Sequence, residues 1–173
     1  MSTSSRQAAG GDSRSSRIAV GSDSRDPVAD SIALTLEEAG FAVIRCGAVE
    51  GPATPWPEVA EQVGRLVAQG AADAGVVCCW TGTGVSIAAN KVPGIRAALC
   101  KDAETARAAR RWNGANVLAL GLDAATPGSA QAIVDAFLGA GGVDPEEVPN
   151  VERVAVMERR YGATRDARRT REG

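Results

Sequence analysis

The sequence predicts an α/β protein with a doubly wound, Rossmann-like fold, in which helices cover both faces of a five-stranded parallel sheet. The first observation is that short apolar runs ending in glycine or polar turns alternate with longer segments of helical periodicity. The second is composition: 45% of the residues are hydrophobic but only 3% are aromatic, so Ala, Val, Leu and Ile must form most of the core. Small aliphatic side chains suit helices packed closely on a parallel sheet. A chain of 173 residues is long enough for one domain with a full core.

The first half of the chain begins the alternation. Strands are expected at 17–23, 41–46 and 75–80, and helices at 27–39 and 58–69. In the first helix Val28, Ile32 and Leu36 recur at helical spacing, and Gly40 follows as a plausible helix stop. Residues 47–57 are rich in proline and glycine, which predicts a loop.

The second half continues the same order. A glycine loop at 81–84 leads into a helix at 85–90, followed by a strand at 95–100, a helix at 103–112, a strand at 117–121 and a helix at 127–138. In doubly wound sheets, ligands bind beyond the carboxyl ends of the strands. The turns that follow the first, third and fourth strands are therefore the expected binding region.

The ends of the chain differ in composition from its centre. Residues 1–16 are rich in Ser, Gly and Arg and lack the apolar stretch of a signal peptide, so we expect a disordered leader. Residues 17–157 form the single expected domain. Residues 158–173 form a charged tail whose arginines are interspersed with acids. We expect this tail to be solvated, with contact to RNA as the alternative.

Charge and residue counts exclude several classes of protein. The net charge of −2, from 19 basic and 21 acidic residues, gives no reason to expect nucleic acid or an anionic membrane as partner. No apolar run approaches the roughly 20 residues that span a bilayer, so a cytoplasmic protein with reduced thiols is expected. The four cysteines show no zinc-binding spacing, so no metal is expected. The chain contains no histidine, which excludes any mechanism that needs its own imidazole.

The segment 78–86 carries the chemically informative pattern, a strand end followed by a glycine-rich turn and a helix start. Gly82 and Gly84 allow the backbone to approach a ligand and to point successive N–H groups at one place. The helix start adds positive potential. The pattern therefore predicts an anion hole, with an ordinary tight turn as the alternative.

Two adjacent cysteines end the third strand. A thiol beside oriented N–H groups can act as a base or nucleophile, whereas a free cysteine elsewhere is more often a small buried hydrophobe. Successive strand residues point to opposite faces, so only one of the pair can face the loop. Cys79 is the candidate for chemistry and Cys78 the candidate for packing.

Residues 79–100 resemble the central signature of the ribose-5-phosphate isomerase B and galactose-6-phosphate isomerase family. Residues 21–23 match that family's opening motif, and residues 113–121 match a third segment in the right order. The resemblance extends from about residue 17 to residue 153.

This resemblance implies a cofactor-independent aldose–ketose isomerase that acts on a sugar or sugar phosphate through a cis-enediolate. Cys79 would be the base, with Thr81 beside it, and the N–H groups of the 81–84 loop would stabilise the enediolate oxygens. The resemblance also implies a homodimer or homotetramer with active sites between subunits and no metal or organic cofactor. The implied substrate-binding residues are Asp23, Ser24, Trp80, Gly82, Thr83, Gly84, Val85, Ser86, Trp112, Asn113 and Arg153.

The sequence departs from the family pattern at residues of direct functional interest. Ser24 and Trp112 stand where the family has histidines, and the one at Trp112 opens the sugar ring. An indole donates a hydrogen bond but cannot shuttle a proton. Trp80 replaces a glycine and adds bulk. Asp123 replaces an arginine, and of a pair of arginines near the C-terminus only Arg153 has a counterpart, so phosphate contacts are thinned.

Three functional interpretations stay open: an isomerase with altered substrate choice, a catalytically altered binding or partner subunit, and a protein that uses Cys79 for other thiol chemistry. Individual residues keep alternatives as well. Asp23 either holds a substrate hydroxyl or caps the following helix, and Asn113 either contacts substrate or forms a helix C-cap. The tryptophans either stack on a sugar face or pack at the rim of the cleft; they are Trp56, Trp80 and Trp112.

Overall fold

The computed structural model describes residues 16–169 and contains one parallel sheet of five strands in the order β2-β1-β3-β5-β4. The strands are β1 (Arg17–Ser22), β2 (Ala42–Gly47), β3 (Ala74–Cys79), β4 (Ala97–Leu99) and β5 (Val117–Gly121). The helices are α1 (Pro27–Glu38), α2 (Trp56–Ala68), α3 (Thr83–Ala89), α4 (Ala103–Asn113), α5 (Pro127–Leu138) and α6 (Val148–Arg169), with a 3₁₀ turn η1 (Pro145–Glu147) before the last. The predicted doubly wound α/β fold is confirmed.

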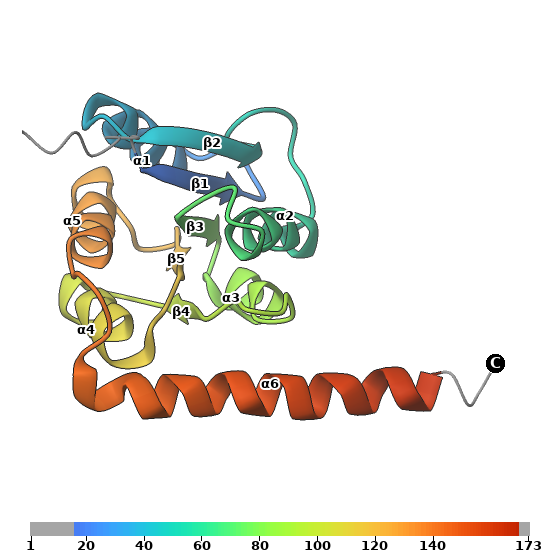
Figure 1. The fold of residues 1–173 in the computed structure, drawn as a ribbon. Helices are drawn as coiled ribbons and strands as arrows, with labels where there is room; N and C mark the ends of the chain where they lie inside the picture. The colour runs from blue at the N-terminus through green and yellow to red at the C-terminus, as the bar shows by residue number, and fades with distance from the viewer. Residues whose placement is uncertain (1–15, 170–173) are drawn as a thin grey trace, which may run out of the picture.

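Two apolar cores lie on opposite faces of the sheet. Helices α1, α4 and α5 cover one face, and α2 and α3 cover the other (Figure 1). Strand β1 lies between β2 and β3 in the sheet. The chain adds β2 on one side of β1 and then β3 on the other side, so the direction in which strands are added reverses between β1 and β3. In such sheets the crevice between the carboxyl ends of these two strands is the usual ligand position.

Side-chain caps mark the starts of α1 and α4, both of which begin at the predicted residue. Asp26 caps α1 by accepting a hydrogen bond from the backbone N–H of Val28 at 2.8 Å, and Asp102 caps α4 by accepting from the N–H of Thr105 at 2.7 Å. Gly114, with φ of 61°, ends α4 in the left-handed conformation that glycine adopts at low cost.

The fourth strand is shorter than the predicted 95–100. The backbone N–H of Ile95 closes a turn onto the carbonyl of Val92 at 3.1 Å, and that of Arg96 donates to the side chain of Asn116 at 2.8 Å. These groups therefore do not join the hydrogen-bond ladder, which starts at Ala97.

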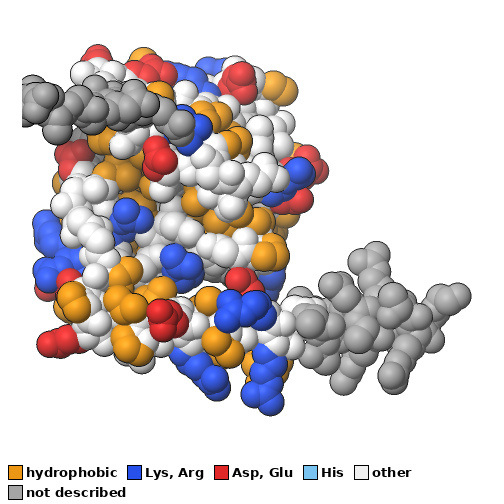
Figure 2. Space-filling model, in the orientation of Figure 1, with side chains coloured by type: hydrophobic (Ala, Val, Ile, Leu, Met, Phe, Trp, Pro, Cys, Tyr) orange, Lys and Arg blue, Asp and Glu red, His pale blue; other side chains and the backbone are white. Residues whose placement is uncertain are grey.

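Helix α6 is a feature that the sequence analysis did not place. The helix is continuous across residues 157 and 158, where the boundary between domain and tail was expected. It runs along the β4 side of the sheet and extends beyond the body (Figure 1). The carboxylate oxygens of Glu158 each lie 3.0 Å from the backbone N–H of Gly94, which ties α6 to the segment before β4. Basic side chains project from α6 away from the body (Figure 2).

Parts of the sequence expectations fall outside the described residues. The expected disordered leader, apart from Ser16, and residues 170–173 of the expected tail lie there. Within residues 16–169, no helix is both long enough and apolar enough to cross a bilayer.

Candidate active site

The two cysteines at the end of β3 point to opposite faces of the sheet. Cys78 lies in the core beneath α1 and α5 with no exposed surface, and burial raises the pKa of its thiol to about 12. That thiol is therefore protonated at neutral pH, which fits a packing role. Cys79 lies on the face covered by α2 and α3, at the carboxyl end of the strand, and is 6% exposed.

The glycine loop after Cys79 has a conformation that requires glycine at one position. Gly82 has φ of 72° and caps the amino end of α3. A Cβ on Gly82 would lie 2.7 Å from the backbone of Leu120 and Gly121, so any side chain there would clash with β5. The left-handed turn thus packs the loop against the neighbouring strand.

The loop presents backbone donors and hydroxyl groups together. The first helical hydrogen bond of α3 runs from the N–H of Ser86 to the carbonyl of Gly82 at 3.1 Å, so the N–H groups of Thr83, Gly84 and Val85 have no partner within the helix. The Thr81 and Thr83 hydroxyl oxygens lie 2.6 Å apart and share a hydrogen bond. The side chain of Val85 is fully buried, so only its backbone can reach a ligand.

The turn after β1 lies beside the cysteine. Ser22 pairs with Cys78 in the parallel register, so Asp23 follows next to Cys79 across the crevice. The buried hydroxyl of Ser22 donates to the carbonyl of Ser24 at 2.7 Å, and the hydroxyl of Ser24 donates to the carboxylate of Asp23 at 3.2 Å. Because Asp26 caps α1, the capping alternative for Asp23 is excluded, and its carboxylate remains at the crevice.

Two of the three tryptophans lie at this edge of the sheet. The ring of Trp56, at the start of α2, packs over Gly84: a Cβ on that glycine would lie 3.1 Å from two ring carbons. Trp56 is 43% exposed, and Trp80, next to Cys79, is 68% exposed. Both indoles could therefore contact a ligand bound at the loop.

A second group of expected site residues lies at the opposite edge. Trp112 and Asn113 end α4, just before the amino end of β5, and Arg153 lies in α6. Each strand residue advances about 3.3 Å, so the length of β5 separates this group from the glycine loop by roughly 15 Å. Within one chain, the structure therefore does not bring the two groups together, and Trp112 is not beside the other two tryptophans. Asn113 is the last residue of α4 and Gly114 is its C-cap, so the alternative that makes Asn113 the C-cap is wrong.

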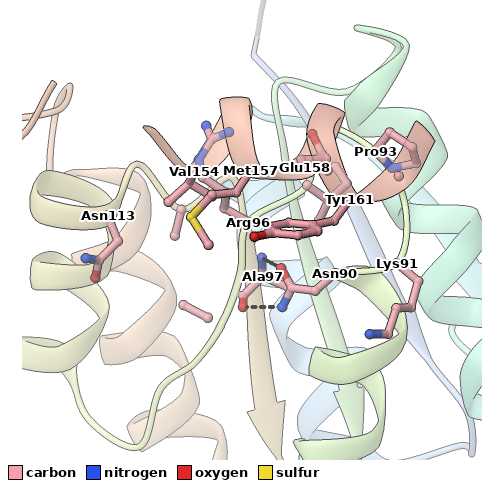
Figure 3. Close-up of a pocket in the computed structure, with 14 residues that line it drawn as sticks. Asn90, Lys91, Pro93, Arg96, Ala97, Asn113, Val154, Met157, Glu158 and Tyr161 are labelled. Atoms are coloured by element: carbon pink, nitrogen blue, oxygen red, sulfur yellow. Dashed lines mark hydrogen bonds between the residues drawn. The ribbon is translucent and has the colours of Figure 1, made fainter. Parts of the chain in front are cut away.

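A groove of about 710 Å³ lies at this second edge, between α6 and the start of β4. Asn113 lines it, together with Arg96 from the body and Met157 and Tyr161 from α6 (Figure 3). The sequence analysis missed this groove. The apolar residues of α6 at spacings of three and four, Val154, Met157 and Tyr161, are the signal that could have found the helix.

The carboxyl-edge arrangement places one thiol beside oriented N–H donors, two hydroxyls and a carboxylate. A base next to preorganised N–H groups is suited to removing a proton beside a carbonyl group and stabilising the resulting oxyanion. Within the described part of the chain, no three His, Cys, Asp or Glu side chains are grouped so as to hold a metal ion.

Comparison with known proteins gives consistent matches over most of the chain. The family model described as "Ribose/Galactose Isomerase" matches residues 18–156. Ribose-5-phosphate isomerase B of Escherichia coli is 41% identical over 125 residues, which are 72% of this chain and 84% of that protein. The galactose-6-phosphate isomerase subunit LacB of Clostridium acetobutylicum is 40% identical over 71% of this chain and 72% of its own length. The D-erythrulose-4-phosphate isomerase of Pectobacterium atrosepticum is 39% identical over 60% of this chain and 68% of its own length.

Solved structures show the same likeness in three dimensions. Ribose-5-phosphate isomerase B of Clostridium thermocellum superposes with a TM-score of 0.78 at 38% identity, covering 84% of this chain and 99% of that one. The enzyme of Mycoplasma genitalium with bound ribulose-5-phosphate superposes with a TM-score of 0.77 at 32% identity, covering 83% of this chain and 96% of that one.

Proposed function

The chain belongs to the ribose/galactose isomerase family of aldose–ketose isomerases, and we propose that it interconverts an aldose and a ketose, free or phosphorylated, with Cys79 as the base. The observation that carries the proposal is the position of the Cys79 thiol at the end of β3, separated from the glycine loop by Trp80 alone and across the crevice from Asp23. Proteins similar to this chain include isomerases of ribose 5-phosphate and galactose 6-phosphate.

The proposed reaction moves one proton between neighbouring carbons. Cys79, as thiolate, removes the proton from the carbon next to the carbonyl, and the electron pair moves to form a cis-enediolate. The N–H groups of Thr83 and Gly84 donate to the enediolate oxygens. The hydroxyls of Thr81 and Thr83 relay a second proton, that of the substrate hydroxyl, from one enediolate oxygen to the other. Return of the proton from Cys79 to the adjacent carbon gives the isomer without any net change in oxidation state.

The second group of residues supports a site shared between two copies. Trp112, Asn113 and Arg153 lie too far from Cys79 to serve the same site within one chain. We infer a homodimer in which each copy's Trp112, Asn113 and Arg153 complete the other copy's site. A homotetramer would pair two such dimers.

The proposed substrate is used in its open-chain form. The chain has no histidine to open a sugar ring, and neither Trp112 nor Thr81 can supply a proton near neutral pH. A four-carbon sugar with a phosphate at its end cannot close a furanose ring. The 39% identity to a D-erythrulose-4-phosphate isomerase supports a substrate of four carbons.

A binding or partner subunit is the second candidate. The similar Clostridium acetobutylicum protein is a subunit of galactose-6-phosphate isomerase, and a bulky, exposed Trp80 adjoins Cys79 here. The experiment that tests the proposal is a panel of aldoses, ketoses and their phosphates, followed by NMR in deuterated water. Deuterium at the carbon next to the carbonyl, with formation of the isomer, is the expected result. A purified homo-oligomer that exchanges none of them would favour the partner subunit.

A further inference from the structure

A cavity of about 220 Å³ opens at the carboxyl end of β5, directly beside the glycine loop. Buried Leu120 and Ile133 form its apolar floor, and exposed Thr81, Lys101 and Asp123 form its rim. A water molecule takes up about 30 Å³, so the cavity has room for roughly three or four hydroxylated carbons. Thr81 belongs to the glycine loop and also lines this cavity. A substrate whose reacting carbons lie at the loop can therefore extend into the cavity.

The backbone fixes Asp123 against the glycine loop. The N–H of Asp123 donates to the carbonyl of Trp80 at 2.9 Å, and the N–H of Leu122 donates to the same carbonyl at 2.9 Å. A Cβ on Gly121 would lie 2.9 Å from the carbonyl oxygen of Thr81 and 3.1 Å from a carboxylate oxygen of Asp123. The carboxylate therefore lies close to the loop and shares the space above Gly121 with it.

The other polar groups of the cavity leave this carboxylate available. The hydroxyl of Ser129 accepts from the N–H of Thr126 at 2.9 Å and donates to its carbonyl at 3.1 Å, so the cap of α5 engages it. Among residues 16–169, no hydrogen bond or ion pair to the carboxylate of Asp123 is found. An ionised carboxylate is an acceptor only and pairs well with hydroxyl groups.

Charge at the carboxyl edge of the sheet, where the cavity lies, is unfavourable for a phosphate. The turns after β1, β4 and β5 carry four carboxylates and two cations, which are Asp23, Asp26, Asp102, Asp123, Arg25 and Lys101. A dianion placed beside Asp123 meets a fixed like charge at short range, which disfavours binding. A neutral hydroxyl group has no such cost and can donate to the carboxylate while accepting from Lys101.

From the cavity, its rim and this charge balance, we propose that Asp123 and Lys101 form a hydroxyl-specific subsite for the end of the substrate remote from the carbonyl. Asp123 thus makes the site select sugars that end in a hydroxyl over sugars that end in a phosphate. This proposal rests on the proposed isomerase function and assigns the substrate class of that site.

The test compares kcat/KM for erythrulose and erythrulose 4-phosphate, a free and a phosphorylated four-carbon ketose neither of which can close a furanose ring, in wild type, Asp123→Asn and Asp123→Arg. Wild type is expected to prefer the free sugar. Asp123→Asn removes the charge at constant shape and should raise the ratio of kcat/KM for the phosphorylated sugar to kcat/KM for the free sugar by about tenfold. Asp123→Arg should raise this ratio further. Glu146→Gln, an exposed acid in η1 far from the loop, is the charge-matched control and should leave the ratio unchanged.

An unchanged ratio in both Asp123 variants, with the wild type active, would overturn the subsite while leaving the isomerase function intact. If the wild type turns over neither sugar, the isomerase function is decided by the wider panel of sugars, and calorimetry with erythritol and inorganic phosphate decides the subsite alone. The subsite then requires that erythritol binds wild type more tightly than Asp123→Arg and that phosphate shows the opposite order. Equal binding of both compounds to both proteins would refute it.

Discussion

The indole ring of Trp56 packs directly on the backbone of Gly84, so that a Cβ on Gly84 would lie 3.1 Å from two ring carbons. This contact joins the start of α2 to the loop that follows the proposed base. Gly82, two residues earlier, is constrained differently, because its φ of 72° and its contact with the backbone of β5 leave no room for adjustment. The two glycines therefore predict different consequences of adding one methyl group.

Gly82→Ala should lower the free energy of unfolding by about 3 kcal/mol or prevent folding, because both the left-handed backbone and the clash with β5 oppose a side chain. Gly84→Ala should leave stability within about 1 kcal/mol, since the exposed indole of Trp56 can move, but should lower kcat by about tenfold through displacement of the loop's donors. Urea denaturation measures the free energy of unfolding, and isomerisation assays measure kcat. Gly51→Ala is the control, because a Cβ there meets nothing within 4 Å. Equal stability loss in all three variants would contradict this account of the loop.

Stability should decline at alkaline pH because buried thiols resist ionisation. Burial raises the pKa of Cys46 and Cys100 to about 11 each and that of Cys78 to about 12, above the value of 9.0 for a free thiol. Above about pH 9 the unfolded chain loses these protons while the folded chain keeps them, so the free energy of unfolding falls as pH rises. The expected slope is about 1.4 kcal/mol per pH unit for each thiol.

Urea denaturation under reducing conditions at about pH 8, 9.5 and 10.5 measures this slope. Cys78→Ala should be less stable at every pH but should show a shallower decline. A free energy of unfolding that stays level to about pH 10.5 would contradict the assigned burial of these thiols.

The sequence predicted the parts of the fold that local chemistry determines. The strand β5 and the helix α5 have the predicted bounds, because each is an uninterrupted apolar or periodic run with clear turn residues at both ends. The predicted fourth strand was too long because the side chain of Asn116, from a distant position, takes the N–H of Arg96. A pairing between residues 20 positions apart leaves no local signal.

The site was predictable only in part for a similar reason. The pattern from Cys79 to Gly84 is continuous in sequence, so its place at the carboxyl edge could be inferred. The separation of Trp112 and Arg153 from that edge follows from the direction in which α4 and α6 run, which the motif does not encode. Helix α6 itself was missed because its apolar residues are sparse among charged ones, and its C-terminal part extends beyond the body (Figure 1).

Mixing two inactive variants should restore activity if each site is built from two copies. Cys79→Ala damages one half of a site and Asn113→Ala the other. Random exchange between the two gives mixed dimers with one intact site each, so about a quarter of all sites should work. Mixing Cys79→Ala with Thr81→Ala, which lie in the same half, is the control and should restore nothing. Failure of the first mixture to recover activity, with subunit exchange shown by native mass spectrometry, would place each site within one chain.

The absence of histidine predicts which sugars are used. A four-carbon substrate should have a higher kcat/KM than ribose 5-phosphate, because the site lacks a group to open a furanose ring. Trp112→His should raise activity on the five-carbon substrate and leave that on the four-carbon one nearly unchanged. Turnover of ribose 5-phosphate by the wild type at about 10⁴ M⁻¹s⁻¹ or above, with tetroses ignored, would mean that another residue opens the ring.

The central claim is that the Cys79 thiol moves the proton, and the rate of deuterium incorporation by Cys79→Ala tests it most directly. On a substrate verified with the wild type, NMR in deuterated water measures both isomer formation and exchange at the carbon next to the carbonyl. Loss of a positioned base should lower kcat for both by at least about 10²-fold. Cys78→Ala, whose side chain lies on the opposite face, should retain kcat while losing stability. Equal rates for Cys79→Ala and wild type would show that Cys79 is not the base.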